Sequence, residues 1–214
     1  QLPLLLAIPA AAAVAGIAGG LLGLPTLRLK GLYFAVSTLA FGEMTRLLLN
    51  IFRYRREVDG EMVGPDGAEG FRDIRYVLEN DISQTEYVLL IYVILLLVLA
   101  GFFILERARL GSVFRMIGED ELAASAQGIN VAGFKLLAVV TASVVAGIGG
   151  ALYAHFTTYL EPSNFGVMLG VHSLAYGLIG GLGTAFGPLL GVGIDIGLLE
   201  SLRGLSQYRM IIFG

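Results

Sequence analysis

The chain has 214 residues, of which 56% are hydrophobic and only 14% are charged, and its mean hydropathy is +0.80. A soluble domain is nearer a quarter charged, so this composition excludes an ordinary water-facing protein. The net charge of −3 offers no basic patch for nucleic acid, and the absence of cysteine excludes thiol catalysis and thiolate metal sites. The 30 glycines are about twice the usual share, which favours closely packed membrane helices.

Apolar stretches with few or no charges predict the membrane spans, and four of them precede Glu161: 1–27, 31–52, 87–105 and 136–160. Only the second of these contains charges, Glu43 and Arg46. A further uncharged stretch, 162–194, is too long for one straight span. Glycines and a proline interrupt it, so we predict two spans, 167–182 and 187–203, joined by a tight turn, with a re-entrant pair as the alternative. Another apolar run begins at Met210.

The expected fold is therefore all-α: one polytopic transmembrane helical bundle of six or more spans, over 1–214, with both ends trimmed. Small residues recur every four positions in three of the spans, and such faces let helix backbones approach closely. The three predicted packing faces are Ala11, Ala15, Gly19 and Gly23; Ala142, Ala146, Gly150 and Ala154; and Gly183, Gly187 and Gly191.

The loop 106–135 has the pattern of an ordered segment rather than a linker. Leu122, Ala126 and Ile129 follow helical spacing, and Glu119, Asp120 and Glu121 suit the positive N-terminus of a short helix over 119–129. Gly128 suits its C-terminal cap and Asn130 the N-cap of the next helix. Such a helix is either a solvated interfacial element or a docking element for a partner.

Motifs for nucleotide binding and hydrolysis are missing from the sequence. Neither of its two lysines follows a glycine-rich phosphate-binding loop, and no zinc-protease or nucleophile-elbow motif is present. We therefore expect a chain that is not an enzyme and holds no cofactor or metal of its own.

Several segments in order resemble a known family. Leu122-Ala-Ala-Ser-Ala-Gln-Gly128 is similar to the E-A-A loop of ABC importer permeases, although Leu122 stands at the glutamate position and Glu121 precedes it. The wider match is to the LivH/LivM-type branched-chain amino acid permeases, on the LivM side. The segments that carry it are 28–43, 109–121, 128–137, 146–154 and 180–188.

The resemblance implies a transport subunit whose short cytoplasmic helix docks into an ATPase. The implied coupling residues are Glu119, Asp120, Glu121, Ala123, Ala124 and Gly128. The implied partners are a second homologous permease subunit, two cytoplasmic ATPase subunits that bind the ATP, an external solute-binding protein and the lipid bilayer. The implied location is the inner membrane, with multiple spans.

Loop charges alone do not fix the topology. The side that holds 106–135 carries six basic and four acidic residues, and the side that holds 53–86 carries seven basic and eleven acidic residues. The resemblance places 106–135 in the cytoplasm, because a coupling loop must face the ATPase. The acidic loop 53–86 is then external, where a binding protein would dock.

Polar groups inside spans are candidates for a substrate path, because burying them in hydrocarbon is costly. Glu43 and Arg46 are spaced to form either a structural ion pair or part of the path, and Asp195 has no obvious local partner. The full set of path candidates is Ser37, Thr38, Glu43, Arg46, His155, Tyr159, His172 and Asp195. Each histidine could equally be a packing residue, and Ser37 and Thr38 could bond back to their own helix.

The expected function is import of branched-chain or related amino acids. Urea or short amides are alternative substrates within the same family. A secondary transporter or channel without an ATPase is the alternative from another class, in which Glu43, Asp195 and the histidines would be proton or ion groups.

Overall fold

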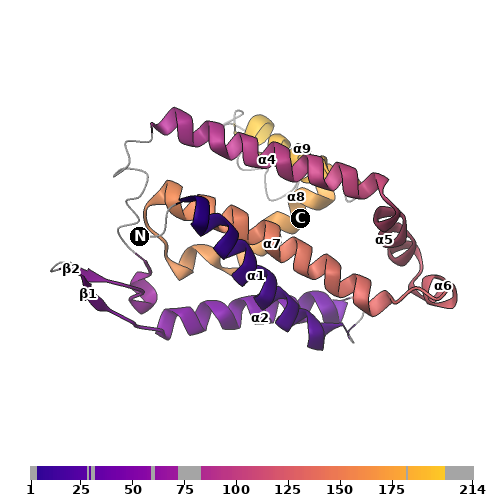
Figure 1. The fold of residues 1–214 in the computed structure, drawn as a ribbon, viewed down its shortest axis with the longest axis horizontal. Coiled ribbons are helices and arrows are strands. Elements are labelled where there is room, and N and C mark those ends of the chain that lie inside the picture. The colour runs from indigo at the N-terminus through magenta and orange to yellow at the C-terminus, as the bar shows by residue number, and fades with distance from the viewer. Residues whose placement is uncertain are drawn as a thin grey trace. The chain divides into compact units, whose positions relative to one another are not determined.

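Helices dominate the computed structural model of the chain, which describes residues 4–27, 29, 32–58, 61–71, 83–181 and 183–200 (Figure 1). The chain divides into two compact units, Gln1–Asn164 and Phe165–Gly214. The expected all-α architecture is confirmed, with one small hairpin added to it. That both units act as one domain stays a prediction, and the apolar run at Met210 lies outside the described residues.

The first unit contains the long helices and the connections between them. In chain order its elements are α1 (Leu4–Thr26), α2 (Leu32–Ile51), β1 (Arg56–Val58), β2 (Glu61–Val63), η1 (Gly67–Glu69), α4 (Gln84–Arg107), α5 (Arg109–Glu119), α6 (Glu121–Ala126) and α7 (Val131–Thr157). A 3₁₀ turn, η2 (Pro162–Phe165), follows them. Among the described helices, α1, α4 and α7 are long and apolar enough to cross a membrane.

The span predicted at 87–105 is longer at both ends. Its helix α4 begins after Ser83, whose hydroxyl accepts the Glu86 amide at 3.2 Å while the Glu86 carboxylate accepts the Ser83 amide at 3.0 Å. This capping box satisfies two of the amides that a helix start leaves unpaired. The helix ends at Arg107 because Ala108 adopts an extended conformation.

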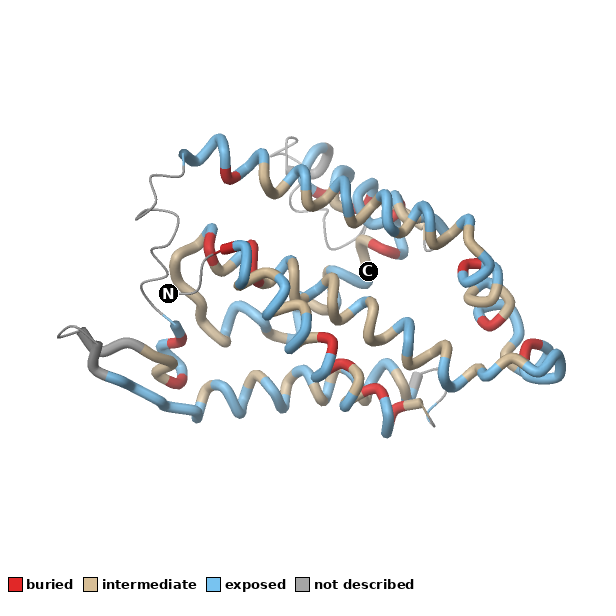
Figure 2. The backbone as a smooth tube through the Cα atoms, viewed as in Figure 1, coloured by how far each residue is buried: buried red, intermediate tan, exposed pale blue. Residues whose placement is uncertain are grey.

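Helix α1 packs on α7 through small residues, as predicted for α1 (Figure 2). Gly16, Gly19 and Gly23 are buried, and a Cβ added at Gly19 would lie 2.0 Å from the Ser143 hydroxyl oxygen. The face predicted on α7 is wrong. The contacting residues there are Val139, Val140, Ser143, Val144 and Gly147, whereas Ala142 and Ala146 are exposed and Gly150 has open space around it. The four-residue repeat identified a stripe of small residues on α7, but this stripe is not the side of α7 that contacts α1.

The loop after α2 folds into a short antiparallel hairpin that composition did not indicate. Arg56 pairs with Val63 and Val58 with Glu61. Gly64 and Gly67 both have positive φ angles, 140° and 57°. A Cβ at Gly64 would lie 2.0 Å from the Tyr54 carbonyl oxygen, so this turn requires glycine. Residues 59–60 and 72–82 of the predicted external loop lie outside the described residues.

The second unit is a helical hairpin. It consists of α8 (Val167–Gly180), α9 (Gly187–Val192) and the π-helical segment η3 (Gly193–Glu200). A Cβ at Gly187 would lie 1.9 Å from the Gly181 carbonyl oxygen, and one at Gly191 would lie 2.1 Å from that of Tyr176. The predicted packing role of Gly187 and Gly191 is confirmed, whereas Gly183 has nothing within 4 Å. Helix α8 has 14 residues, fewer than the ~20 that span a bilayer, so its length favours the re-entrant alternative.

Candidate functional site

The loop predicted as one helix over 119–129 is divided at Asp120. Glu119 is the last residue of α5, and Asp120 is extended, with φ −153° and ψ 106°. Its carboxylate accepts the amides of Leu122 at 2.8 Å and Ala123 at 3.1 Å. Capping of α6 by Asp120 therefore competes with continuation of α5, and the break that results was not predicted.

Helix α6 is joined to the start of α7 by a short connection and an ion pair. Gly128 has a φ of 80°, which suits a residue just past a helix end, and Asn130 accepts the Gly133 amide at 3.1 Å as the N-cap of α7. The Lys135 ammonium lies 2.5 Å from the Glu121 carboxylate. Ala124 is 1% exposed and faces inward. The rest of the helix points outward, with Leu122, Ala123, Ser125 and Ala126 exposed.

On α2, Glu43 and Arg46 form the predicted ion pair. Arg46 Nε donates to Glu43 Oε2 at 3.0 Å, and a second contact joins the other atoms of the two groups, so the pair is bidentate. Thr38 donates to the Ala35 carbonyl at 2.9 Å, which is the back-bonding alternative. The Ser37 hydroxyl is buried and has no hydrogen-bond partner among the described residues.

The path candidates His155 and Tyr159 do not lie on one helix. Helix α7 ends at Thr157, and Thr158 adopts a left-handed conformation with φ 57°, so Tyr159 lies beyond the helix. The buried His155 Nδ1 contacts the Ala151 carbonyl at 2.9 Å, as a packing histidine does. The Tyr159 hydroxyl donates to the Glu161 carboxylate.

Tyr87 joins α4 to α7 and was missed by the sequence analysis. It is 2% exposed, its hydroxyl donates to the Leu152 carbonyl at 2.7 Å, and its ring stacks on Phe156 with centroids 6.3 Å apart. A tyrosine at the start of a span is the one signal that could have identified it, because such residues often anchor helix ends.

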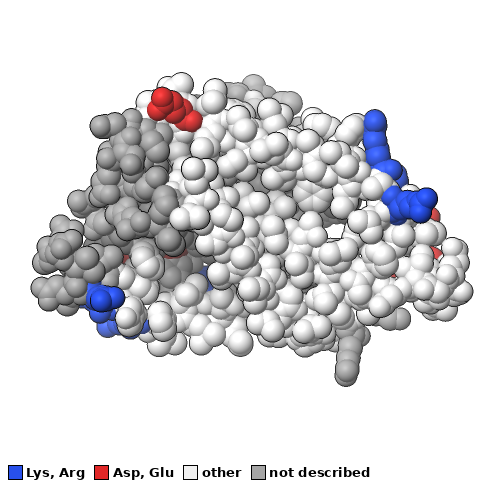
Figure 3. Space-filling view, in the orientation of Figure 1, with Lys and Arg blue, Asp and Glu red and all other residues white. Residues whose placement is uncertain are grey.

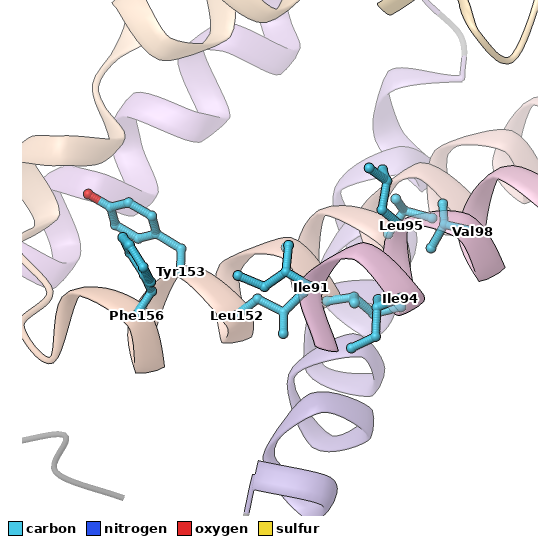
Figure 4. Close-up of a pocket in the computed structure, with 10 residues that line it drawn as sticks. Ile91, Ile94, Leu95, Val98, Leu152, Tyr153 and Phe156 are labelled. Atoms are coloured by element: carbon cyan, nitrogen blue, oxygen red, sulfur yellow. The ribbon is translucent and has the colours of Figure 1, made fainter. Parts of the chain in front are cut away.

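Beyond Tyr87, an apolar cavity of about 360 Å³ lies between α4 and α7 (Figure 4). Its side chains are aliphatic or aromatic, and only Tyr153 carries a polar atom, which points away from Ile91 and Leu95. A zwitterion needs polar partners for both charged groups. This cavity supplies none, so it suits hydrocarbon rather than a whole amino acid.

In the second unit, Asp195 has a partner that the sequence analysis did not identify. The Tyr176 hydroxyl donates to Asp195 Oδ2 at 2.9 Å, and the carboxylate residue is 4% exposed. His172 stacks on Tyr176 with ring centroids 6.4 Å apart. The π-helical turn that carries Asp195 is of a kind often found at functional sites.

A charged pocket of about 500 Å³ follows α2, lined by Arg53, Arg55, Asp66, Ala68 and Glu69. Arg55 forms an ion pair with Asp66. Backbone hydrogen bonds from Tyr54 to Pro65, at 2.9 Å, and from Gly67 to Phe52, at 3.0 Å, hold the two sides of the pocket together. Among the described residues no group of three histidine or acidic side chains is placed to hold a metal ion.

The long apolar helices, their glycine contacts and the charged groups held in pairs define a helical membrane protein. Residues 1–214 match the family described as branched-chain amino acid transport system, permease component, and the chain belongs to that family.

Two curated relatives have the name high-affinity branched-chain amino acid transport system permease protein LivM, one from Escherichia coli (strain K12) and one from Salmonella typhimurium (strain LT2). Each is 31% identical over 97% of this chain and 53% of the relative. The chain thus spans about half the length of these relatives. No solved structure matches it. The predicted family is confirmed, whereas the roles of individual coupling and path residues stay predictions.

Proposed function

We propose that the chain is a permease subunit of an ATP-driven importer for branched-chain or related amino acids, with multiple spans in the inner membrane. The family membership and the printed names of the two relatives support this substrate class. The chain would work with a second homologous permease, two cytoplasmic ATPase subunits that bind the ATP and an external solute-binding protein.

The observation that carries the coupling proposal is the attachment of α6 to α7. A short helix can transmit a pull only if it is joined to a membrane helix, and α6 is joined to α7 by a short connection and by the Glu121–Lys135 ion pair. The Asn130 side chain caps the start of α7 itself. Its exposed side, which includes Leu122 at 76% exposure, is the surface we propose for the ATPase. Closure of the ATPases would then move α6 and α7 together. This movement would change the side of the membrane to which the substrate path is open.

On the opposite side of the membrane, the charged pocket after α2 is our proposed contact for the binding protein. Arg55 is about half exposed and its neighbours carry both signs of charge, which favours specific docking over simple attraction. For the substrate itself, the buried Asp195 carboxylate, held by Tyr176, is the acidic group we propose for the ammonium.

A crosslinking experiment tests this proposal, and the cysteine-free chain makes it simple. Ser125→Cys places a thiol on the exposed side of α6, and Ser163→Cys places one at an exposed position after the opposite end of α7 as a matched control. Both variants are co-expressed with the ATPase and permease subunits of the same source. We expect a nucleotide-sensitive crosslink to the ATPase from position 125 alone.

Uptake of labelled leucine and of labelled urea by the same complex separates the two substrate classes. Leucine uptake that depends on ATP supports the proposal, whereas urea uptake alone would replace the substrate class. If position 125 reacts only from outside, or never approaches an ATPase in a folded complex, the coupling proposal is wrong.

A further inference from the structure

The arginine at the end of α4 lies on the side of the helix that faces outward. Leu97 and Ile104, one to three turns earlier, are 67% and 68% exposed, and Phe103 is 40% exposed. Exposed apolar side chains on a membrane span are lipid-facing in the assembled membrane unless another chain covers them. The Arg107 guanidinium carbon lies 4.0 Å from the centre of the Phe103 ring, so it sits on the same side.

Two further arginines lie close to this point. Arg109 is the first residue of α5, and Arg115 donates to the Glu106 carbonyl at 3.0 Å, which brings it back to the end of α4. Both side chains are exposed. Figure 3 shows basic side chains at the end of the molecule where Figure 1 shows α5. We call Arg107, Arg109 and Arg115 the arginine cluster.

The orientation of α5 keeps this cluster on the surface. Gly111 and Ile117 are buried, and Phe114 meets Phe134 of α7 edge to face with centroids 5.8 Å apart. The apolar side of α5 is therefore used in packing on the protein. Its other side, at Arg109 and Arg115, points outward beside the end of a membrane span.

The acidic groups near the cluster do not neutralise it. Glu106 precedes Arg107 and is partly buried, and Glu119 lies at the far end of α5. The three arginines thus have one acidic residue close to them in the sequence, Glu106, which leaves a local excess of positive charge.

We propose that the arginine cluster binds the headgroup of an anionic phospholipid. Because Arg107 ends a lipid-facing side of α4, its guanidinium lies at the depth where headgroups begin. A guanidinium group matches the geometry of a phosphodiester, and the net positive charge favours a lipid without a compensating cation. The acyl chains of that lipid lie along Leu97, Phe103 and Ile104.

The absence of tryptophan makes the test direct, because a single introduced tryptophan reports only its own surroundings. Ile104→Trp places the reporter one turn before Arg107. Leu89→Trp, at a residue 65% exposed near the other end of α4, is the matched control. The full chain is reconstituted in phosphatidylcholine vesicles that contain brominated phosphatidylglycerol or brominated phosphatidylcholine, and quenching by each gives their relative binding.

We expect phosphatidylglycerol to be preferred at position 104 by about fivefold for each arginine that engages, and not to be preferred at position 89. Added salt lowers the preference at position 104. The triple variant R107Q, R109Q and R115Q removes the preference for phosphatidylglycerol. Arg107→Gln alone lowers this preference in part. Arg56→Gln, at an exposed residue after α2, leaves it unchanged.

Equal quenching by the two lipids at position 104 would overturn the proposal, as would a preference that survives in the triple variant. If the triple variant leaves lipid binding unchanged and instead weakens ATPase binding in the assembled complex, the cluster docks a protein. Circular dichroism and gel filtration of each variant test whether the chain remains folded. If the triple variant does not fold, the quenching measured with Arg107→Gln tests the proposal.

Discussion

Lys135 Nζ lies 2.5 Å from a carboxylate oxygen of Glu121, so the start of α7 is tied to the first residue of α6. The contact joins residues 14 positions apart across the Asn130 cap. The ion pair therefore links α6 to α7 in addition to the short chain connection between them. Helix α7 in turn packs on α1 along much of its length.

Loss of this ion pair should reduce the coupling of transport to ATP hydrolysis more than it reduces the stability of the protein. We expect Glu121→Gln to lower transport driven by ATP by about fivefold or more, the lower end of typical coupling effects. The free energy of unfolding should change by about 1 kcal/mol or less, because the pair is partly exposed. Uptake per molecule of ATP hydrolysed, together with thermal unfolding, measures both effects.

Gly118→Ala provides the control, because Gly118 is exposed, a Cβ there would meet nothing within 4 Å, and it is not a predicted coupling residue. The charge exchange E121K with K135E should restore most of the lost coupling. Unchanged coupling in Glu121→Gln would show that the ion pair transmits nothing.

Tyr87 should hold the N-terminal end of α4 against α7. Tyr87→Phe removes the hydrogen bond to the Leu152 carbonyl and should cost about 1 kcal/mol. Tyr87→Ala also removes the stacking on Phe156 and leaves a gap, at about 3–5 kcal/mol. Tyr92→Phe on the same helix, at a residue 62% exposed, should have almost no effect. Unfolding of the three variants in detergent ranks them, and an equal loss for Y92F and Y87F would contradict the assignment.

Gly19 should be required for the contact between α1 and α7. In Gly19→Ala the new Cβ would lie 2.0 Å from the Ser143 hydroxyl oxygen and 2.5 Å from its Cβ, and overpacking of this kind costs about 1–3 kcal/mol. Ser143→Gly in the same chain should recover most of the loss, because it removes both atoms. Gly150→Ala, which meets nothing within 4 Å, is the neutral control. A stability of G19A equal to that of G150A would refute the close approach.

Sequence patterns predicted the elements of this protein better than the contacts between them. Hydropathy placed α4 within three residues at each end, because charged and capping residues bound an uncharged run. The stripe Ala142, Ala146, Gly150 and Ala154 did not predict the packing side of α7, because small residues permit a close approach without requiring it.

The same limit applies to the candidate sites. The Glu43–Arg46 pair was predictable because its members are three positions apart on one helix and therefore lie on the same face. Asp195 and Tyr176 are 19 residues apart on two helices, so only the hairpin geometry brings them together. The break at Asp120 depends on a choice between two local hydrogen-bonding patterns, which composition does not decide.

Glu43 and Arg46 allow a test of whether their pair is structural or part of the substrate path. Loss of one partner leaves an unpaired charge on α2, the second predicted span, so Glu43→Gln and Arg46→Gln should each reduce the amount of folded protein. The double variant removes both charges and should recover that amount. If the pair only joins helices, transport recovers along with folding. If the pair lines the path, the double variant folds but its transport stays low, and KM for the substrate rises. Quantification of folded protein in the membrane, followed by uptake per folded molecule, separates the two roles.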